Sequence, residues 1–186
     1  MIQPTQLQID GIKQILESSI DALILNDSDI FNIDFIMPRR ISPDAILLNR
    51  ELHETTINHR LAFYIENALR NTDLEFYNVD IEYNRYYDNL KLLETIEGQI
   101  SVRPDILVHS RINDQVTQQH YLVIEAKKNR ITPHDINKIQ GFISDDHYNY
   151  LFGLTVSYRR NADFVLANLY YFNGHIIANE PINRPK

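Results

Sequence analysis

Hydrophobic residues recur at three- and four-residue steps in three segments of the chain, and this spacing predicts three amphipathic helices. The first segment is Ile9–Leu25, the second is about Arg50–Arg70, and the third opens at Thr132-Pro133, where proline suits the first turn of a helix. The positions expected to face the core are Ile9, Ile12, Leu16, Ile20, Leu23 and Ile24, then Ile57, Leu61, Ile65, Ala68 and Leu69, and finally Ile136, Ile139 and Ile143.

Between the second and third helices the pattern changes to the two-residue alternation of β-strands. Leu74–Asn84 alternates imperfectly, and short apolar runs follow at Ile106–Val108 and Tyr121–Ile124. The polar stretch Ser110–Gln119 separates these two runs, so we expect two strands joined by an exposed loop. The pattern of Tyr86–Ile96 favours neither a helix nor a strand.

Two more strands are expected after the third helix, at Tyr150–Val156 and Phe164–Phe172. Asn173-Gly174 then predicts a two-residue hairpin turn before His175. This order of elements predicts an α/β or α+β fold with one mixed sheet. The chain has 186 residues and no linker-like stretch. We therefore expect a single domain, with an N-terminal helical region at 1–50 and a core at about 50–180.

Composition argues against several classes of protein. The chain has no cysteine, which excludes disulfides and thiolate zinc sites. No apolar run reaches the roughly 18 residues of a membrane-spanning helix, and no secretory signal is visible, so a cytoplasmic protein without a membrane partner is expected. The zinc-protease pattern fails because Ile57 stands where His53-Glu54 would need a second histidine. Neither a serine-hydrolase motif nor a glycine-rich phosphate loop is present.

The net charge of −7 is unevenly distributed. Residues 1–97 contain 8 Lys/Arg against 17 Asp/Glu, whereas residues 98–186 contain 10 against 8. A strongly acidic chain disfavours simple coating of nucleic acid, and any polyanion should meet the second half first. A bound metal cation would reverse the local field of an acidic centre, so a nucleic-acid enzyme stays compatible with this charge.

Three charged residues stand at the ends of the two apolar strands. Glu125 and Lys127 lie two positions apart, so on a strand they share one face, while Asp105 begins the neighbouring run. Pairing of the two strands can bring the carboxylates together, and such groups repel each other unless a cation lies between them. Hard oxygen ligands suit Mg²⁺ or Mn²⁺. These residues therefore predict a metal site that polarises a phosphate, with Lys127 orienting water or stabilising the transition state.

Pro104-Asp105 followed by Glu125-Ala126-Lys127 resembles the motif of the PD-(D/E)XK nuclease superfamily, which includes restriction-endonuclease-like and Holliday-junction-resolvase-like enzymes. The resemblance covers roughly Arg50–Tyr158, and the segments Asn58–Ala62 and Val79–Arg85 are similar to bacterial members. It implies a restriction-endonuclease-like mixed central β-sheet flanked by helices. It also implies Mg²⁺-dependent hydrolysis of phosphodiester bonds, with DNA favoured over RNA.

In that superfamily a further carboxylate usually comes from a helix before the sheet, and two glutamates compete for this role. Glu54 lies seven residues before Leu61 and therefore shares the inward face of the second helix. Glu66 lies toward the edge of that face, about 100° from Ile65. We favour Glu54 as the third metal ligand. For either residue, the alternative is a solvated helix charge.

Basic residues around the motif are candidate phosphate contacts. Lys128, Arg130 and Lys138 flank the motif and the helix that follows it, and Arg159-Arg160 could supply a second contact. A solvated basic face would explain them equally well. No base-reading motif is present, which favours low sequence specificity or recognition of DNA structure. Double-strand cleavage at a fixed site would require a homodimer, for which Ile9–Leu25 could provide the contact, although an amphipathic helix more commonly packs on its own domain.

The main alternative is a binding module that keeps the nuclease fold without catalysis. The acidic charge and the absence of a recognisable DNA-reading domain favour this alternative. The presence of Asp105, Glu125 and Lys127 together disfavours it. A separate alternative for Glu125 and Lys127 is an exposed ion pair on an edge strand, worth little stability.

Overall fold

The computed structural model describes residues 1–27, 30, 54–83, 85–86, 89–90, 92–95, 98–111, 116–159 and 163–186. Its described helices are α1 (Gln6–Asp27), α3 (Glu54–Leu69) and α4 (Pro133–Ser144). Its strands are β1 (Asn78–Ile81), β2 (Arg85–Tyr86), β3 (Asn89–Leu90), β4 (Leu92–Thr95), β5 (Gly98–Ser101), β6 (Ile106–His109), β7 (His120–Lys127), β8 (Phe152–Ser157), β9 (Phe164–Phe172), β10 (Ile177–Pro181) and β11 (Arg184–Pro185).

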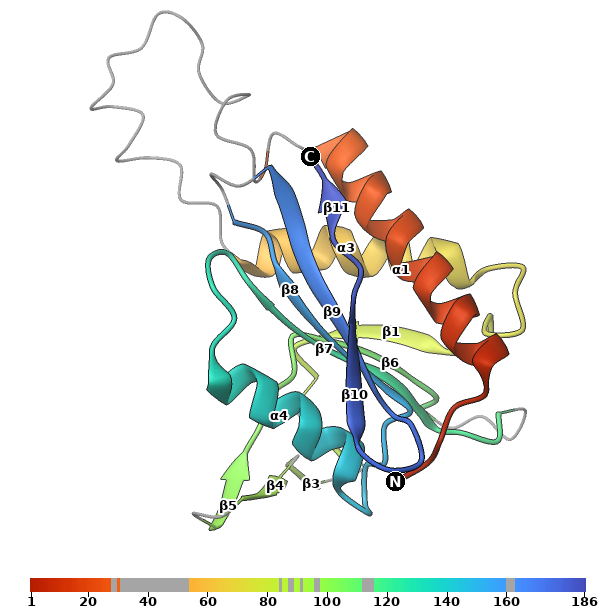
Figure 1. Ribbon diagram of the computed structural model, residues 1–186, viewed down its shortest axis with the longest axis vertical. Coiled ribbons are helices and arrows are strands. Elements are labelled where there is room, and N and C mark those ends of the chain that lie inside the picture. The colour runs from red at the N-terminus through yellow and green to blue at the C-terminus, as the bar shows by residue number, and fades with distance from the viewer. Residues whose placement is uncertain are drawn as a thin grey trace, which may run out of the picture.

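A seven-stranded mixed sheet forms the centre of the fold (Figure 1). The strand order is β1-β6-β7-β8-β9-β10, and β11 also pairs with β9. β7 and β8 run parallel, and the other described pairs in this sheet are antiparallel. A parallel pair needs a crossover connection, which here contains α4. The mixed α/β fold expected from the sequence is thus confirmed.

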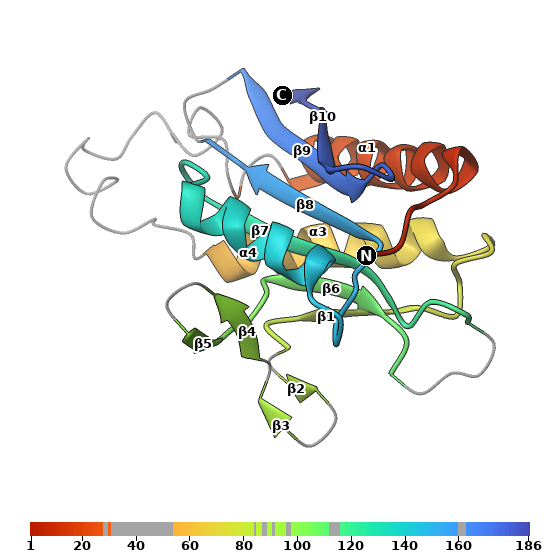
Figure 2. The ribbon, with the colours of Figure 1, turned by 60° about the horizontal axis from the view of Figure 1, so that its bottom comes forward.

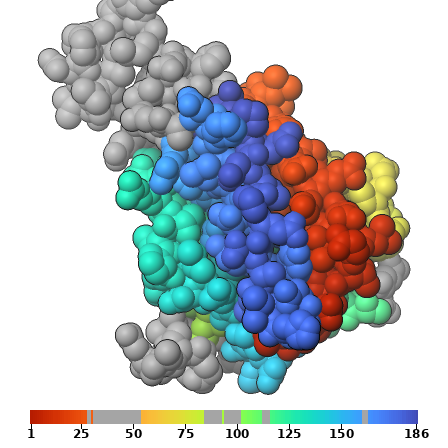
Figure 3. Space-filling model, in the orientation of Figure 1, coloured from red at the N-terminus to blue at the C-terminus, as the bar shows by residue number. Residues whose placement is uncertain are grey.

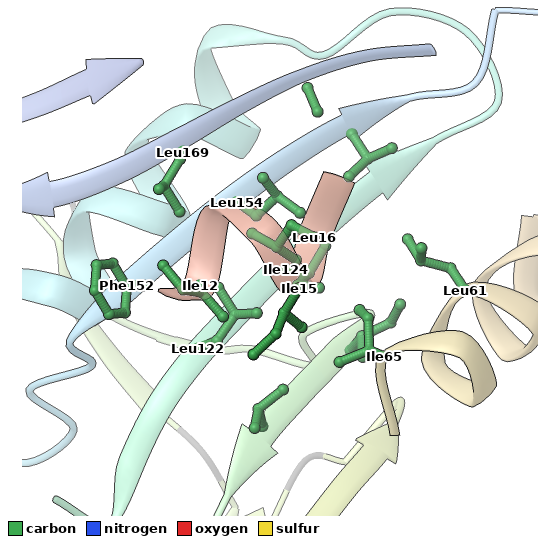
Figure 4. Packing of buried hydrophobic residues seen from close by; sticks show 14 of the residues in the cluster. Ile12, Ile15, Leu16, Leu61, Ile65, Leu122, Ile124, Phe152, Leu154 and Leu169 are labelled. Atoms are coloured by element: carbon green, nitrogen blue, oxygen red, sulfur yellow. The ribbon is translucent and has the colours of Figure 1, made fainter. Parts of the chain in front are cut away.

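Helices α1 and α3 cover one face of the sheet, and α4 lies on the other (Figure 2). The three- and four-residue spacing in α1 and α3 places their apolar side chains against β7, β8 and β9. The buried residues labelled in Figure 4 come from both helices and these three strands: Ile12, Ile15, Leu16, Leu61, Ile65, Leu122, Ile124, Phe152, Leu154 and Leu169.

The apolar face of α1 is used inside this fold. Ion pairs also join α1 to the C-terminal strands, since Lys13 Nζ lies 2.7 Å from Glu180 Oε2 and Arg184 Nε donates to Asp21 Oδ1 at 2.7 Å. Figure 3 shows α1 in red directly beside the blue C-terminal strands. Most apolar residues of Ile9–Leu25, the segment considered for a homodimer contact, are therefore packed on their own chain, whereas Leu25 is exposed.

Helix α4 begins where the sequence predicts. Thr132 accepts a hydrogen bond from the backbone of Asp135, and the Asp135 carboxylate accepts one from the Thr132 N–H, which together form a capping box. Ile139 and Ile143 are fully buried, whereas Ile136 is only partly buried. The cap fixes the start of α4 after the connection 128–132 that follows β7.

Close packing of α4 on β8 depends on a glycine. A Cβ at Gly153 would lie 2.4 Å from Ile139 Cγ2 and 3.2 Å from Ile143 Cδ1. We expect Gly153→Ala to lower the free energy of unfolding by about 1–3 kcal/mol, because the helix must move away from the sheet. Chemical denaturation measures this change. Gly11→Ala is the matched control, since nothing lies within 4 Å of its Cβ and alanine favours a helix. Equal stability of the two variants would contradict the packing argument.

Several predicted strand boundaries were wrong, including that of the strand predicted from Tyr150, since β8 begins at Phe152. Residues 74–76 form a turn, with the Tyr77 N–H donating to Leu74 O, so β1 begins only at Asn78. The hairpin after β9 has four loop residues instead of two, because Phe172 pairs with Ile177. The Asn173 side chain accepts hydrogen bonds from two backbone N–H groups within this loop, which stabilises the longer turn.

Some sequence predictions fall on parts of the chain outside the described residues. These include much of the predicted N-terminal helical region 1–50, the first four residues of the predicted second helix, and Asn84. The segment 86–96, whose sequence pattern favoured neither a helix nor a strand, contributes to two short hairpins, β2–β3 and β4–β5. Across the described helices, none combines the length and apolar character needed to cross a membrane.

Candidate active site

The candidate site lies where β7 extends past the beginning of β6. Ile106 pairs with Ile124, so β6 offers no partner to the later N–H groups on that edge of β7. Side-chain carboxylates accept the hydrogen bonds of these N–H groups instead. The Ala126 N–H donates to Asp105 Oδ2 at 2.8 Å, and the Lys128 N–H donates to Glu54 Oε2 at 2.8 Å. Two acidic side chains are therefore fixed beside the end of β7 because buried backbone donors need acceptors.

Lys127 lies between these two carboxylates. Its Nζ is 3.3 Å from Glu54 Oε1 and 3.3 Å from Asp105 Oδ2. Burial lowers the Lys127 pKa, but the charges of Asp105, Glu54 and Glu125 outweigh this effect and raise it. Burial also raises the pKa of Asp105, against the opposing effects of the Ala126 N–H and the Lys127 ammonium. The cluster therefore holds a cation at a point where two carboxylates converge.

Glu125 occupies a buried position on the same strand. Its side chain is 1% exposed, and Lys138 Nζ of α4 lies 2.6 Å from its Oε1. The Lys138 ammonium therefore places a positive charge directly beside this buried carboxylate. Burial raises the Glu125 pKa to about 7, despite the nearby Lys138 ammonium. The carboxyl group therefore titrates near neutral pH, which is typical of functional sites.

A buried hydrogen bond anchors the start of α3 beside the site. Tyr158 Oη donates to Asn58 Oδ1 at 2.9 Å, and the Tyr158 N–H donates to Lys127 O at 3.0 Å. Asn58 lies one helical turn after Glu54, so this bond fixes the helix end that carries the carboxylate. Neither residue was predicted from the sequence to have a role at the site. A polar Asn at a position on the apolar face of the helix was the available signal.

The structure separates the two competing helix glutamates. Glu54 joins the cluster, whereas Glu66 is exposed and lies twelve residues farther along α3, or about 18 Å. Figure 1 shows the start of α3 beside the ends of β7 and β8. Asp105, Glu125 and Lys127 lie at this same end, as the strand pattern predicted.

The predicted phosphate contacts have different surroundings. Lys138 is directed to Glu125, with its side chain only 16% exposed, so it compensates a buried charge. Lys128 is half-buried, and its backbone contacts Glu54. Arg130 and Arg159 both line a half-open pocket of about 210 Å³ at the ends of β8 and β9. Arg160 lies outside the described residues.

The described part of the chain contains no group of three or more His, Cys, Asp or Glu side chains arranged to hold a metal ion. In the geometry observed, Lys127 takes the cationic position between Glu54 and Asp105, and Lys138 takes the one beside Glu125. No protein-family model matches the chain, and comparison with curated proteins gives no match.

Proposed function

We propose that this protein is a metal-dependent nuclease of the PD-(D/E)XK superfamily that hydrolyses phosphodiester bonds in DNA. One observation carries the proposal. Glu54 and Asp105, from two separate elements of the fold, converge on Lys127 of a third. Glu125, two residues earlier on the same strand, contributes its negative charge to that lysine. The cluster unites the residues of the Pro104-Asp105 and Glu125-Ala126-Lys127 motif with a helix-borne acid.

The donor chemistry of the cluster fits Mg²⁺ or Mn²⁺. Glu54, Asp105 and Glu125 offer hard carboxylate oxygens, and no softer His or Cys ligand stands among them. The position between Glu54 and Asp105 already holds a positive charge, the ammonium group of Lys127. When bound, a divalent ion would supply Lewis-acid polarisation of the phosphate and a lower pKa for a coordinated water.

The remaining chemistry belongs to the protein side chains. Lys127 would orient the attacking water or stabilise negative charge on the phosphate oxygens in the transition state. The hydrogen bonds from the Ala126 and Lys128 N–H groups keep the Asp105 and Glu54 carboxylates in place without substrate. Such preorganisation lowers the reorganisation needed during the reaction.

Cleavage assays test this proposal directly. Wild-type protein is expected to cut plasmid or single-stranded DNA with Mg²⁺ or Mn²⁺ and to stop when EDTA is added. Glu54→Gln should reduce the rate at least about 10-fold because it alters a metal-binding oxygen. Glu66→Gln is the matched control on the same helix and should keep the wild-type rate. Equal rates for the two variants would show that Glu54 has no role in cleavage. Absence of cleavage with either metal would reject the proposal that the protein is a nuclease.

Substrate preference follows from the same assay. The proposal includes low sequence specificity or recognition of DNA structure, because no base-reading motif was found in the sequence. Duplex, nicked, branched and single-stranded DNA, with RNA alongside, distinguish these alternatives. Discrete fragments from one duplex sequence would contradict low specificity.

A catalytically silent binding module is the second candidate, and the ion pairs favour it. Lys127 and Lys138 offset two of the three negative charges of Glu54, Asp105 and Glu125 without any metal ion. A site whose charges are largely offset in this way could persist as a structural feature. DNA binding that is unchanged by Mg²⁺, together with absence of cleavage, would support this candidate.

A further inference from the structure

The pocket at the ends of β8 and β9 lies next to the candidate active site. In the parallel pair, Ser157 of β8 is the register partner of Lys127, and Ser157 lines the pocket. Arg130 follows Lys127 by three residues in the connection to α4. The pocket therefore begins about one strand spacing, roughly 5 Å, from the backbone that carries Lys127.

A continuous row of polar residues links the two places across the sheet. Glu125 is the register partner of Thr155, and Thr155 is the register partner of Asn168 on β9. Register partners share a face, so these side chains lie on the side of the sheet that α4 covers. Thr155 is 1% exposed, and its hydroxyl oxygen has no hydrogen-bond partner among the described residues. Asn168, at the end of this row, lines the pocket.

The lining of the pocket selects for an anion. Among the six described lining residues, two are arginines and none is acidic; the set is Arg130, Ile131, Ser157, Arg159, Leu166 and Asn168. Within the described chain, neither arginine forms an ion pair. Arginine is well suited to phosphate because its planar donors match the phosphate oxygens. The local charge is thus opposite in sign to that of the chain as a whole, which is −7.

The size and the lining of the pocket limit which anionic ligands can bind. Its volume of about 210 Å³ is several times the roughly 30 Å³ share of one water molecule, so it can hold a phosphate with part of its sugar. None of its described lining residues is aromatic, so these side chains offer no stacking surface to a base. Ile131 and Leu166 offer apolar contact suited to a sugar.

The backbone of Arg159 supports a positioning role. Its φ is +23°, a region that residues other than glycine and asparagine seldom adopt. The preceding Tyr158 N–H donates to Lys127 O, and Lys186 Nζ donates to Arg159 O. These bonds hold the strained residue in place and fix where its side chain starts. Such strain persists where the surrounding structure over-determines it, often at binding sites.

We infer that Arg130 and Arg159 form a phosphate-binding subsite, which holds a nucleic-acid strand beside the carboxylate cluster. This inference rests on the proposed nuclease function, because that function makes a polynucleotide the natural source of the phosphate. The phosphate is either a terminal group of the strand or an internal group next to the scissile one. Both sources present the same chemistry to the pocket.

Binding measurements without metal test the subsite independently of cleavage. In EDTA, fluorescence anisotropy follows a 3′-labelled single-stranded oligonucleotide, which is competed by unlabelled oligonucleotides with a 5′-phosphate or a 5′-hydroxyl. Arg130→Gln and Arg159→Gln should each weaken binding about 5- to 10-fold and reduce the salt dependence by about one phosphate contact. Arg70→Gln removes the same charge from an exposed residue just after α3 and should have little effect.

The two oligonucleotides identify the source of the phosphate. A terminal-phosphate subsite predicts tighter binding of the 5′-phosphorylated strand, with the preference lost in the double variant. An internal subsite predicts equal binding of both strands and an equal loss in the variants. Inorganic phosphate should raise the melting temperature of the wild type more than that of the double variant. The inference would be overturned if the Arg130→Gln and Arg159→Gln variants bound the oligonucleotide as Arg70→Gln does and the double variant responded to phosphate as Arg70→Gln does. This outcome does not depend on whether the wild type cleaves DNA.

Discussion

Replacing Lys127 with methionine is expected to lower DNA cleavage by about 100- to 1,000-fold while strengthening the binding of Mn²⁺. The loss follows from removing a preorganised cationic donor, whose deletion typically raises the barrier by about 3–4 kcal/mol. The gain follows because the ammonium group, 3.3 Å from both Glu54 and Asp105, no longer occupies the place that attracts a cation. Methionine keeps a similar length and flexibility without the charge.

Two measurements separate these effects. Initial cleavage rates report the catalytic loss, and the Mn²⁺-induced rise in melting temperature reports metal binding by mass action. Lys13→Met is the matched control, because Lys13 of α1 pairs with Glu180 and not with the carboxylate cluster. A control variant that loses as much cleavage as Lys127→Met would mean that general positive charge matters more than this position. A smaller Mn²⁺ response in Lys127→Met would contradict competition between the ammonium group and the ion.

Without metal, Glu125→Gln is expected to be more stable than the wild type at pH 8. Between pH 4 and pH 8, the difference in free energy of unfolding between the two proteins should shift by up to about 3 kcal/mol in favour of the variant. Burial raises the Glu125 pKa from 4.5 to about 7 in the folded state. The folded protein therefore binds the proton more tightly than the unfolded chain. Its contribution to stability is fully present below about pH 4.5 and is lost as the pH rises to about 7. One pKa unit corresponds to about 1.4 kcal/mol, which sets the expected size.

Urea denaturation in EDTA between pH 4 and pH 8 measures this difference. Glutamine has nearly the same shape and does not titrate, so the gap between variant and wild type isolates Glu125. The exposed Glu66→Gln should show no such widening of the gap with pH. A gap for Glu125→Gln that stays constant over this range would show that Glu125 is ionised throughout. The expected result would mean that this residue is retained at a cost in stability, as is common for functional groups.

The sequence predicts the centre of the site because its geometry depends on local rules. Alternation along a strand places Glu125 and Lys127 near each other, and pairing of two short apolar runs brings Asp105 to the same end. Glu54 is identified as the carboxylate from the helix because it lies seven residues, or about two turns, before Leu61 and so shares its face. Each of these inferences needs only the period of one element or the pairing of two neighbouring strands.

Features that depend on packing between distant elements were not predictable in this way. The contact of Lys138 with Glu125 requires α4 to cross over the sheet at a close distance, which Gly153 permits. The arginine pocket combines the connection after β7 with the ends of β8 and β9. The four-residue loop after Phe172 differs from the two-residue turn suggested by Asn173-Gly174, because strand register set the loop length.

The amide groups of Ala126 and Lys128 make this site observable without any label or substrate. Unlike ordinary strand amides, they donate to the side chains of Asp105 and Glu54. Their hydrogen-exchange rates and NMR chemical shifts therefore depend on the position of two acidic side chains as well as on the sheet. Amides deeper in β7 depend on the sheet alone, which provides an internal reference. Arrival of an ion or a phosphate at the carboxylates can thus be followed at two backbone positions while the rest of the strand is unchanged.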